Sequence, residues 1–194
     1  ASVIAAKAGV TTGEWGGAMR EIFGEYRAPT GVGKTVSAAT GNLAEVRAAV
    51  EAASGRLGRR IKFLVGKPGL DGHSNGAEQF AVRARDCGME VVYEGIRLTP
   101  AQIVNAALEE SVHVVGLSIL SGSHLPLVTE VLERMRADGI GDVPLVVGGI
   151  IPDVDADLLR AAGVARVYTP KDFELNRIML DIVELADAGA RAAA

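Results

Sequence analysis

The sequence predicts a doubly wound α/β domain that follows a helical N-terminal extension. Two observations predict this fold: from residue 61 onward, short β-branched apolar runs recur, and amphipathic segments of helix length separate them. Continuous apolar runs of this kind are typical of strands that are buried on both faces of a parallel sheet. The chain of 194 residues, 48% of them hydrophobic, is long enough to bury a sizeable core.

The N-terminal part is expected to be helical up to residue 26. Thr11 and Glu14 have the spacing of a capping box. An apolar stripe follows at helical spacing, formed by Trp15, Met19, Ile22 and Phe23. Residues 27–41 are rich in small residues and proline and lack apolar periodicity, so they are expected to form a linker. We therefore predict a helical segment and linker over 1–41 and a separate domain over 42–194.

Strands and helices are expected to alternate through the second domain. The expected strands are 61–65, 90–95, 112–118, 144–149 and 165–169. The expected helices are 42–57, 75–87, 100–110, 123–138, 153–162 and 172–189. Thr99 as cap, Pro100 and Gln102 mark one helix start clearly. This alternation favours the flavodoxin-like strand order 2-1-3-4-5, in which right-handed crossovers place the strand-to-helix loops at the one edge where such sheets bind ligands.

Charge and composition exclude several classes of protein. A net charge of −4, from 20 basic and 24 acidic residues, leaves no broad cationic face for nucleic acid or anionic lipid. The single cysteine, Cys87, excludes an intrachain disulfide framework and fits a reducing cytoplasm. No apolar run approaches the ~20 residues that span a bilayer, and the N-terminus lacks the pattern of a secretion signal. We therefore expect a cytoplasmic protein with neither nucleic-acid nor membrane partners.

The loop after the first expected strand carries the most chemistry. Residues 66–76 (GKPGLDGHSNG) contain four glycines and exceed the roughly 2–6 residues that usually connect a strand to a helix. The spacing Asp71-x-His73 can place a carboxylate beside an imidazole, which fixes the tautomer and raises the basicity of Nε2. This arrangement suits a metal ligand or a general base. The alternative is a histidine that only braces the loop.

Small residues follow the third and fourth expected strands. They would leave a slot between the strands, in which the Ser118 hydroxyl could bond a heteroaromatic nitrogen. The alternative is that Gly148-Gly149 forms only a tight turn. Of the other histidines, His113 is expected to be structural, because it starts a buried strand. His124 is expected to open a helix near the slot.

Three elements in this order carry a specific resemblance: Asp71-x-His73-x-x-Gly76, then Ser118-x-Leu120, then Gly148-Gly149. Together they resemble the cobalamin-binding domain of coenzyme-B₁₂ mutases and methionine synthases. The loop at 66–76 is most similar to ethylmalonyl-CoA mutases. The similarity covers roughly residues 61–190, and the N-terminal helix and linker are similar to the segment that joins the catalytic barrel of such mutases to this domain.

The resemblance implies that cobalamin binds base-off, with its dimethylbenzimidazole tail in the slot and His73 as the lower axial cobalt ligand through Nε2. Asp71 would hydrogen-bond His73, and Lys67 would pair with Asp71. The implied cofactor contacts are Lys67, Asp71, Gly72, His73, Ser74, Asn75, Gly76, Ser118, Leu120, Gly122, Gly148, Gly149, Tyr168 and Thr169. The sequence at 169–172 (TPKD) departs from the glycine-proline-glycine-threonine usual in methylmalonyl-CoA mutases.

The resemblance also implies an activity for the intact family: an adenosylcobalamin-dependent mutase that interconverts ethylmalonyl-CoA and methylsuccinyl-CoA by radical chemistry. Substrate binding would belong to a TIM barrel of about 250 residues that is absent here. We therefore expect this chain to bind cobalamin without isomerising acyl-CoA. The family implies further partners, namely other copies in a homo-oligomer and a GTPase chaperone.

Alternative functions remain open at this point. A methylmalonyl-CoA-type mutase would have the same domain, since acyl-chain specificity lies in the barrel. A cobalamin carrier or sensor is a second class, but such proteins place a four-helix module before the domain, and the residues before 61 predict about two helices. The third is a flavodoxin-like domain whose loop binds FMN or only braces the fold.

Overall fold

The computed structural model describes residues 1–24, 43–172 and 174–192. By its internal contacts the chain divides into two compact units, Ala1–Ala39 and Thr40–Ala194. The whole predicted linker at 27–41 and the predicted boundary after it lie outside the described residues. Among the described residues, no helix combines the length and the apolar character that a membrane span needs.

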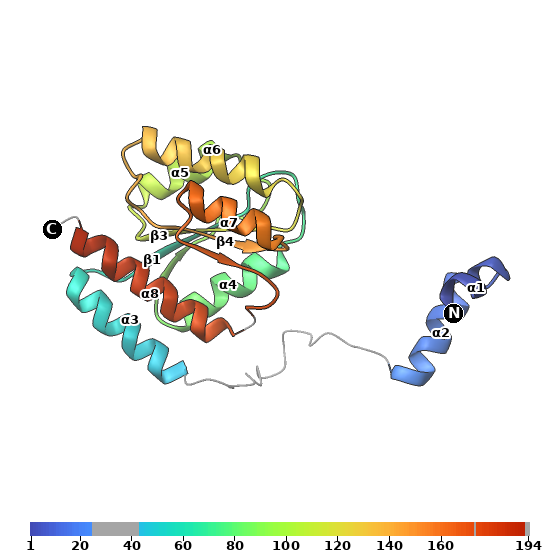
Figure 1. Cartoon of the computed structure of the whole chain (residues 1–194). Coiled ribbons are helices and arrows are strands. Elements are labelled where there is room, and N and C mark those ends of the chain that lie inside the picture. Colours follow the sequence, from blue (N-terminus) through green and yellow to red (C-terminus); the bar gives the residue numbers. More distant parts are fainter. Residues whose placement is uncertain (25–42, 173, 193–194) are drawn as a thin grey trace. The chain divides into compact units, whose positions relative to one another are not determined.

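The described part of the N-terminal unit is helical (Figure 1), with α1 at Ser2–Lys7 and α2 at Thr12–Phe23. Thr11 caps α2, because its Oγ1 accepts from the Glu14 N–H and the Glu14 carboxylate accepts from the Thr11 N–H. This confirms the predicted capping box. The apolar stripe of α2 stays exposed, from 37% at Met19 to 75% at Phe23, so it forms no core of its own.

The second unit contains a five-stranded parallel sheet in the order β2-β1-β3-β4-β5, which confirms the predicted topology. The strands are β1 (Lys62–Gly66), β2 (Glu90–Val92), β3 (Val114–Ile119), β4 (Leu145–Gly149) and β5 (Arg166–Tyr168). Strand β2 is shorter than the predicted 90–95, because the backbone bends away and takes positive φ at Gly95 and Arg97. The register pairs Val65 with Gly116 and Ser118 with Gly148.

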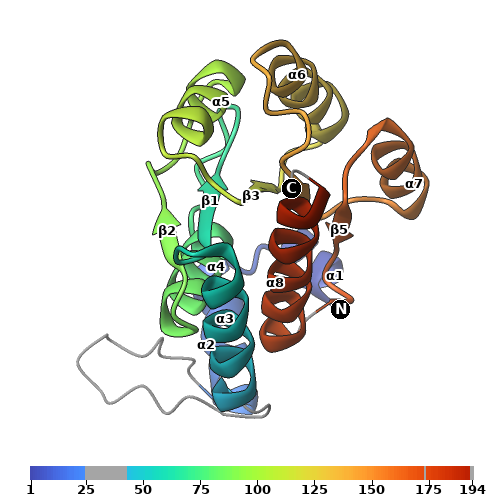
Figure 2. The ribbon, with the colours of Figure 1, turned by 90° about the vertical axis from the view of Figure 1, so that its left-hand side faces the viewer.

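Helices cover both faces of this sheet (Figures 1 and 2). One face is covered by α5 (Pro100–Glu109), α6 (His124–Ala137) and α7 (Asp153–Ala162). The other is covered by α3 (Leu43–Leu57), α4 (Asn75–Asp86) and α8 (Leu175–Ala192). Successive strand residues alternate between the two layers: Phe63 and Val65 pack toward α4 and α8, and Leu64 packs toward α5. Burying each such side chain contributes about 1.5–3 kcal/mol, so the core fixes the register of the sheet.

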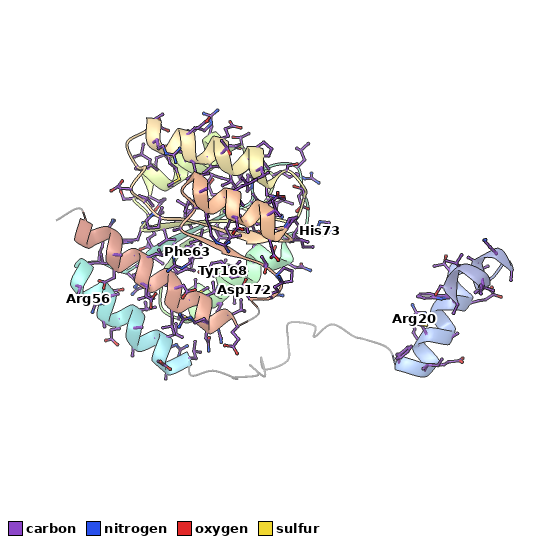
Figure 3. All side chains as sticks on the ribbon, in the orientation of Figure 1. Arg20, Arg56, Phe63, His73, Tyr168 and Asp172 are labelled. Carbon is purple, nitrogen blue, oxygen red and sulfur yellow. The ribbon has the colours of Figure 1, made fainter. Side chains whose placement is uncertain are left out.

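This topology brings the loops after β1, β3 and β4 to one edge of the sheet. Because all five strands are parallel, their carboxyl ends share that edge. Figure 3 shows His73 at this end of the second unit and Arg56, on α3, at the opposite end. The predicted site residues that follow β1, β3 and β4 therefore share one edge.

Candidate functional site

The loop between β1 and α4 is tied to the neighbouring segment before α5. The Gly69 N–H donates to the Leu98 carbonyl at 3.0 Å, and the Leu98 N–H donates to the Lys67 carbonyl at 3.1 Å. Gly69 has φ +85°, and a Cβ there would lie 3.0 Å from the Leu127 side chain. Glycine at this position therefore satisfies both a left-handed backbone and a close approach. These bonds give the loop a fixed base.

A buried ion pair supports the loop from below. Lys67 is completely buried, and its Nζ donates to Oδ2 of Asp71 at 2.8 Å. Only 8% of the Asp71 side chain is exposed. The Lys67 ammonium, followed by the bonds from His73, holds the pKa of Asp71 well below its ordinary value. Asp71 is therefore a carboxylate at any physiological pH.

His73 is oriented by this carboxylate and is open to solvent. Its Nδ1 lies 2.6 Å from Oδ1 of Asp71, and its backbone N–H donates to the same oxygen at 3.0 Å. Because an ionised carboxylate only accepts, Nδ1 carries the proton, and the neutral ring keeps its lone pair on Nε2. The side chain is 80% exposed, and Nε2 bonds none of the described residues. The ring therefore presents a basic nitrogen to a ligand.

The rest of this loop leads into α4 and toward β3. Ser74 precedes α4 without a side-chain cap bond, and Asn75 is the first helical residue. A Cβ at Gly76 would lie 3.8 Å from the Ser118 hydroxyl, so the start of α4 and the end of β3 are neighbours. Gly72 is exposed at the tip of the loop. The structure thus brings Ser118 close to the histidine loop, as the sequence led us to expect.

The two glycines that end β4 have different steric surroundings. A Cβ at Gly149 would overlap the carbonyl oxygen of Ile119, its partner in β3. At Gly148, the nearest atom to a Cβ would be the Leu117 carbonyl oxygen at 4.0 Å, so the space there is open. Close strand packing therefore accounts for Gly149, whereas Gly148 leaves room beside β3.

A small apolar cavity lies between the sheet and the layer of α4 and α8. Its volume is about 30 Å³. The lining residues are Phe63, Val65, Phe80, Gly116, Val146, Gly148, Tyr168, Ile178 and Ile182. Figure 3 labels Phe63 and Tyr168 in this part of the second unit. The cavity shares Gly148 with the predicted slot, but Ser118, Leu120 and Gly149 do not line it, and a bicyclic aromatic ring needs more room than it offers.

The end of β5 is occupied by internal hydrogen bonds. Tyr168 is buried, its hydroxyl donates to Asp181 at 3.3 Å, and burial raises the pKa of the phenol. The backbone N–H and hydroxyl of Thr169 both donate to Asp172, at 2.8 and 3.2 Å. In place of the glycine-rich sequence, this segment therefore forms a turn closed by Asp172. The expectation that Tyr168 and Thr169 contact a ligand stays a prediction.

Exposed apolar side chains follow β1, β3 and β4 at the same edge of the sheet. Leu70 is 89% exposed, Ile150 is 65% exposed and Val154 is 72% exposed, and Leu120 adds a partly exposed side chain after β3. Gly122, in the same β3–α6 loop, is also exposed. Sequence reasoning named Leu120 and Gly122 but missed the other three, because the exposure of a single apolar residue in a loop or a first helical turn leaves no periodic signal. We call Leu70, Leu120, Ile150 and Val154 the apolar rim.

A second histidine–carboxylate pair lies at this edge. His124 is the first residue of α6, as predicted, and its Nε2 lies 2.7 Å from Oδ2 of Asp155 on α7. Sequence reasoning missed Asp155, because 31 residues separate the partners. His113 is elsewhere: its Nδ1 accepts from the Lys62 N–H at 2.9 Å, at the start of β1.

His73 has one ring nitrogen, Nε2, that is available to a metal. Its nearest carboxylate, Asp71, is already engaged by Lys67 and by the ring itself. Among the described residues, no group of three or more His, Cys, Asp or Glu side chains is placed to hold a metal ion. A metal at Nε2 would therefore take its remaining ligands from groups other than these side chains.

Comparison with known proteins identifies close relatives. The chain is 67% identical over 193 residues to ethylmalonyl-CoA mutase of Cereibacter sphaeroides, which covers 100% of this chain and 29% of the relative. It is 56% identical over 187 residues to ethylmalonyl-CoA mutase of Methylorubrum extorquens, covering 96% of this chain and 27% of the relative. Methylmalonyl-CoA mutases among the matches are 34–36% identical. The chain thus spans less than a third of the length of the two ethylmalonyl-CoA mutases.

Solved structures with the same fold serve different functions. A cobalamin-binding protein from Desulfitobacterium hafniense DCB-2 superposes with a TM-score of 0.55 at 18% identity, covering 89% of this chain and 75% of that one. A response-regulator receiver domain from Francisella superposes at 0.52 with 12% identity, covering 66% of this chain and 98% of that one. These likenesses confirm the flavodoxin-like fold alone. The sequence is more specific, because the model of the B12 binding domain matches residues 61–172, from the start of β1 to the turn after β5. The chain therefore belongs to the B12-binding domain family.

Proposed function

We propose that this chain binds cobalamin base-off, with Nε2 of His73 as the lower axial ligand of cobalt, and serves as the cofactor domain of an adenosylcobalamin-dependent acyl-CoA mutase. The observation that carries the proposal is the exposed Nε2 of a ring whose Nδ1 is bonded to an ionised carboxylate. The Lys67–Asp71 pair beneath it is buried, so the ring is held at one place on the sheet edge.

The residues at the edge fit a corrin. The macrocycle supplies four nitrogen ligands in its plane, so the protein needs to add only one imidazole below it. The apolar rim would meet the apolar face of the ring, and burying those four side chains favours binding by about 25 cal/mol per Å². A ligand that covers the rim would also remove exposed apolar surface that a soluble protein otherwise keeps small.

The nucleotide tail would enter the domain beside β3 and β4. Gly116 and Gly148 line the cavity without side chains, and Ser118 stands between this region and the histidine loop. Because the cavity holds about 30 Å³, the dimethylbenzimidazole would have to displace the Phe63 ring or shift α4 or α8 outward. A Cβ at Gly116 would lie 2.6 Å from that Phe63 ring, so this strand position already allows close aromatic packing. We propose that the ring takes the place of the present packing.

Asp71 would strengthen the axial bond. A carboxylate that accepts from Nδ1–H increases the electron density on Nε2, and it prevents the ring from rotating away from the metal. When bound, the cofactor would supply a weak cobalt–carbon bond for radical chemistry. The chain's own residues hold the lower face: His73 provides the nitrogen, Asp71 orients it and Lys67 fixes Asp71.

The identity of the relatives supports ethylmalonyl-CoA and methylsuccinyl-CoA as the substrate pair of the whole enzyme. The 67% and 56% identities to ethylmalonyl-CoA mutases exceed the 34–36% to methylmalonyl-CoA mutases, which remain the second candidate. Substrate binding would lie in the part of the relatives that this chain does not span. The exposed stripe of α2 would pack against that catalytic part. The homo-oligomer and the GTPase chaperone stay predictions.

Absorption spectroscopy tests the axial ligand. Hydroxocobalamin added to the 194-residue chain should give the spectrum of histidine-ligated, base-off cobalamin. His73→Ala should lose that ligation and keep the circular dichroism of the fold, whereas His113→Asn, at another histidine, should keep it. An unchanged cobalamin spectrum with His73→Ala would show that another group binds cobalt.

Activity measurements test the assignment to a mutase. The chain alone should not isomerise ethylmalonyl-CoA or methylmalonyl-CoA, even when loaded with adenosylcobalamin. The full-length polypeptide should convert ethylmalonyl-CoA at least tenfold faster than methylmalonyl-CoA, which corresponds to about 1.4 kcal/mol. The reverse preference would favour a methylmalonyl-CoA mutase. Turnover by the chain alone would contradict the proposal that catalysis needs the part of the enzyme that this chain does not span.

A further inference from the structure

His124 is a buried histidine that no step of the proposed function uses. Only 5% of its side chain is exposed, and its Nε2 donates to the Asp155 carboxylate, which accepts at 2.7 Å. His124 is the first residue of α6, and Asp155 lies in the first turn of α7. The bond therefore connects the starts of two neighbouring helices at the edge of the sheet where His73 lies.

The strands beneath these helices are fixed independently. Ile119 at the end of β3 pairs with Gly149 at the end of β4, and a side chain at Gly149 would overlap the Ile119 carbonyl. From there the chain leads through two short loops, 120–123 and 150–152, into α6 and α7. The loops are thus held at their base by the strand pairing and at their far ends by His124–Asp155.

The helix starts lack the local caps seen elsewhere in the chain. Within the described residues, neither Ser123 before α6 nor Pro152 before α7 makes a side-chain cap bond, whereas α2 and α5 have complete capping boxes. A bond between the two first turns can take over the fixing of both helix starts. It would set the spacing between the loops that carry Leu120 and Ile150 of the apolar rim.

The pair is not built for stability alone. Nδ1 of His124 is buried and finds no hydrogen-bond partner among the described residues, which costs free energy that an apolar side chain of similar shape would avoid. Asp155 is partly exposed, so water could solvate it if the histidine were absent. A contact with this unfavourable feature is better explained by the geometry that it fixes.

We propose that His124 is a positioning residue of the cobalamin site: its bond to Asp155 holds the β3–α6 and β4–α7 loops at the separation that the corrin requires. This inference rests on the proposed function. It assigns His124 no contact with cobalt, and it separates the role of this histidine from that of His73.

Titration of the 194-residue chain with hydroxocobalamin tests the inference, with thermal unfolding recorded on the same samples without cofactor. His124→Phe and Asp155→Leu should each raise the dissociation constant about tenfold, and the bound form should keep the histidine-ligated spectrum. The double variant should be no weaker than either single variant, because both remove one bond. His124→Gln, which keeps a donor toward Asp155, should recover affinity to within about threefold of the unaltered chain.

His113→Phe is the matched control. It also removes a histidine with one bonded and one buried unpartnered nitrogen, but it directly precedes β3 and bonds Lys62 at the start of β1, away from the site. Its cobalamin affinity should equal that of the unaltered chain, whatever its melting temperature. If His124→Phe does not fold, Asp155→Leu removes the same bond from its more exposed side.

The outcomes separate the two proposals. Normal binding by the unaltered chain with unchanged affinity in His124→Phe or Asp155→Leu would overturn the positioning role and leave the proposed function intact. Equal weakening of His124→Gln and His124→Phe would also overturn it. No cobalamin binding by the unaltered chain would overturn both proposals.

Discussion

Two histidines at one edge of this domain form nearly the same bond in opposite surroundings. His73 and Asp71 are 2.6 Å apart, and His124 and Asp155 are 2.7 Å apart. The His73 side chain is 80% exposed over a buried carboxylate, whereas the His124 side chain is 5% exposed against a partly exposed carboxylate. The contact alone therefore does not define a role. A free ring nitrogen at the surface suits a ligand, and a buried ring suits the fixing of loops.

The largest expected effect concerns Lys67, whose buried ammonium pairs with Asp71 beneath the exposed His73. Lys67→Met would leave the Asp71 carboxylate, 8% exposed, without its ammonium partner. Removing one member of a buried ion pair typically lowers the free energy of unfolding by about 3–5 kcal/mol, and we expect a loss in this range from urea unfolding.

Lys171→Met is the matched control for that variant. Lys171 also pairs with a carboxylate, that of Asp153, but both side chains are more than three-quarters exposed. Its removal should cost less than about 1 kcal/mol, as is usual for surface ion pairs. Similar losses of unfolding free energy in Lys67→Met and Lys171→Met would contradict the view that a buried ion pair supports the exposed His73.

Substitutions in β4 test the β3–β4 contact from which the loops to His124 and Asp155 begin. Gly149→Ala places a methyl group on the Ile119 carbonyl oxygen, so the strands must separate, and we expect a loss of about 3 kcal/mol in the free energy of unfolding. Gly148→Ala meets its nearest atom at 4.0 Å and should cost less than about 1 kcal/mol. Guanidinium unfolding of both variants measures the difference, and equal stabilities would show that the β3–β4 contact can relax.

The sequence predicted those features of the fold that depend on neighbouring residues. The capping boxes at Thr11 and Thr99 depend on residues three positions apart, and both are present. The strand order follows from alternation and handedness, and Lys67 reaches Asp71 over four positions. His124–Asp155 could not be predicted in this way, because it requires the packing of two helices from separate crossovers.

The predicted slot shows a different limit. Glycines at the ends of β3 and β4 indicated room between the strands, but the size of the cavity depends on where the Phe63 ring, Phe80 and Tyr168 settle. Packing of residues from six separate elements determines that volume, and no short pattern encodes it. The cavity volume of about 30 Å³ was therefore not predictable from the sequence, and the slot for a ligand stays a prediction.

Removing the charge of each carboxylate compares the two pairs directly. Asp71→Asn should weaken hydroxocobalamin binding about 10–100-fold, because the ring would lose the negative charge that raises the basicity of Nε2. Asp155→Asn should weaken it less than about threefold, because the amide oxygen still accepts from His124 and no metal ligand depends on the charge. Absorbance titrations measure both constants. Equal weakening would mean that both carboxylates act in the same way.

The smallest expected effect is on the pH dependence of stability. The pKa of Asp71 in the folded chain is held below its ordinary value, chiefly by Lys67, so the unfolded chain binds a proton there at higher pH than the folded chain does. The stabilisation is therefore complete above the unfolded-state pKa of about 4 and is lost as the pH falls toward the folded-state value. Urea unfolding between pH 6 and pH 2.5 should show a steeper loss of stability below pH 4 for the unaltered chain than for Asp71→Asn, which has no group to protonate. Parallel curves would mean that Lys67 and His73 do not hold Asp71 in its ionised form, and the tautomer that leaves Nε2 free would lose its physical basis.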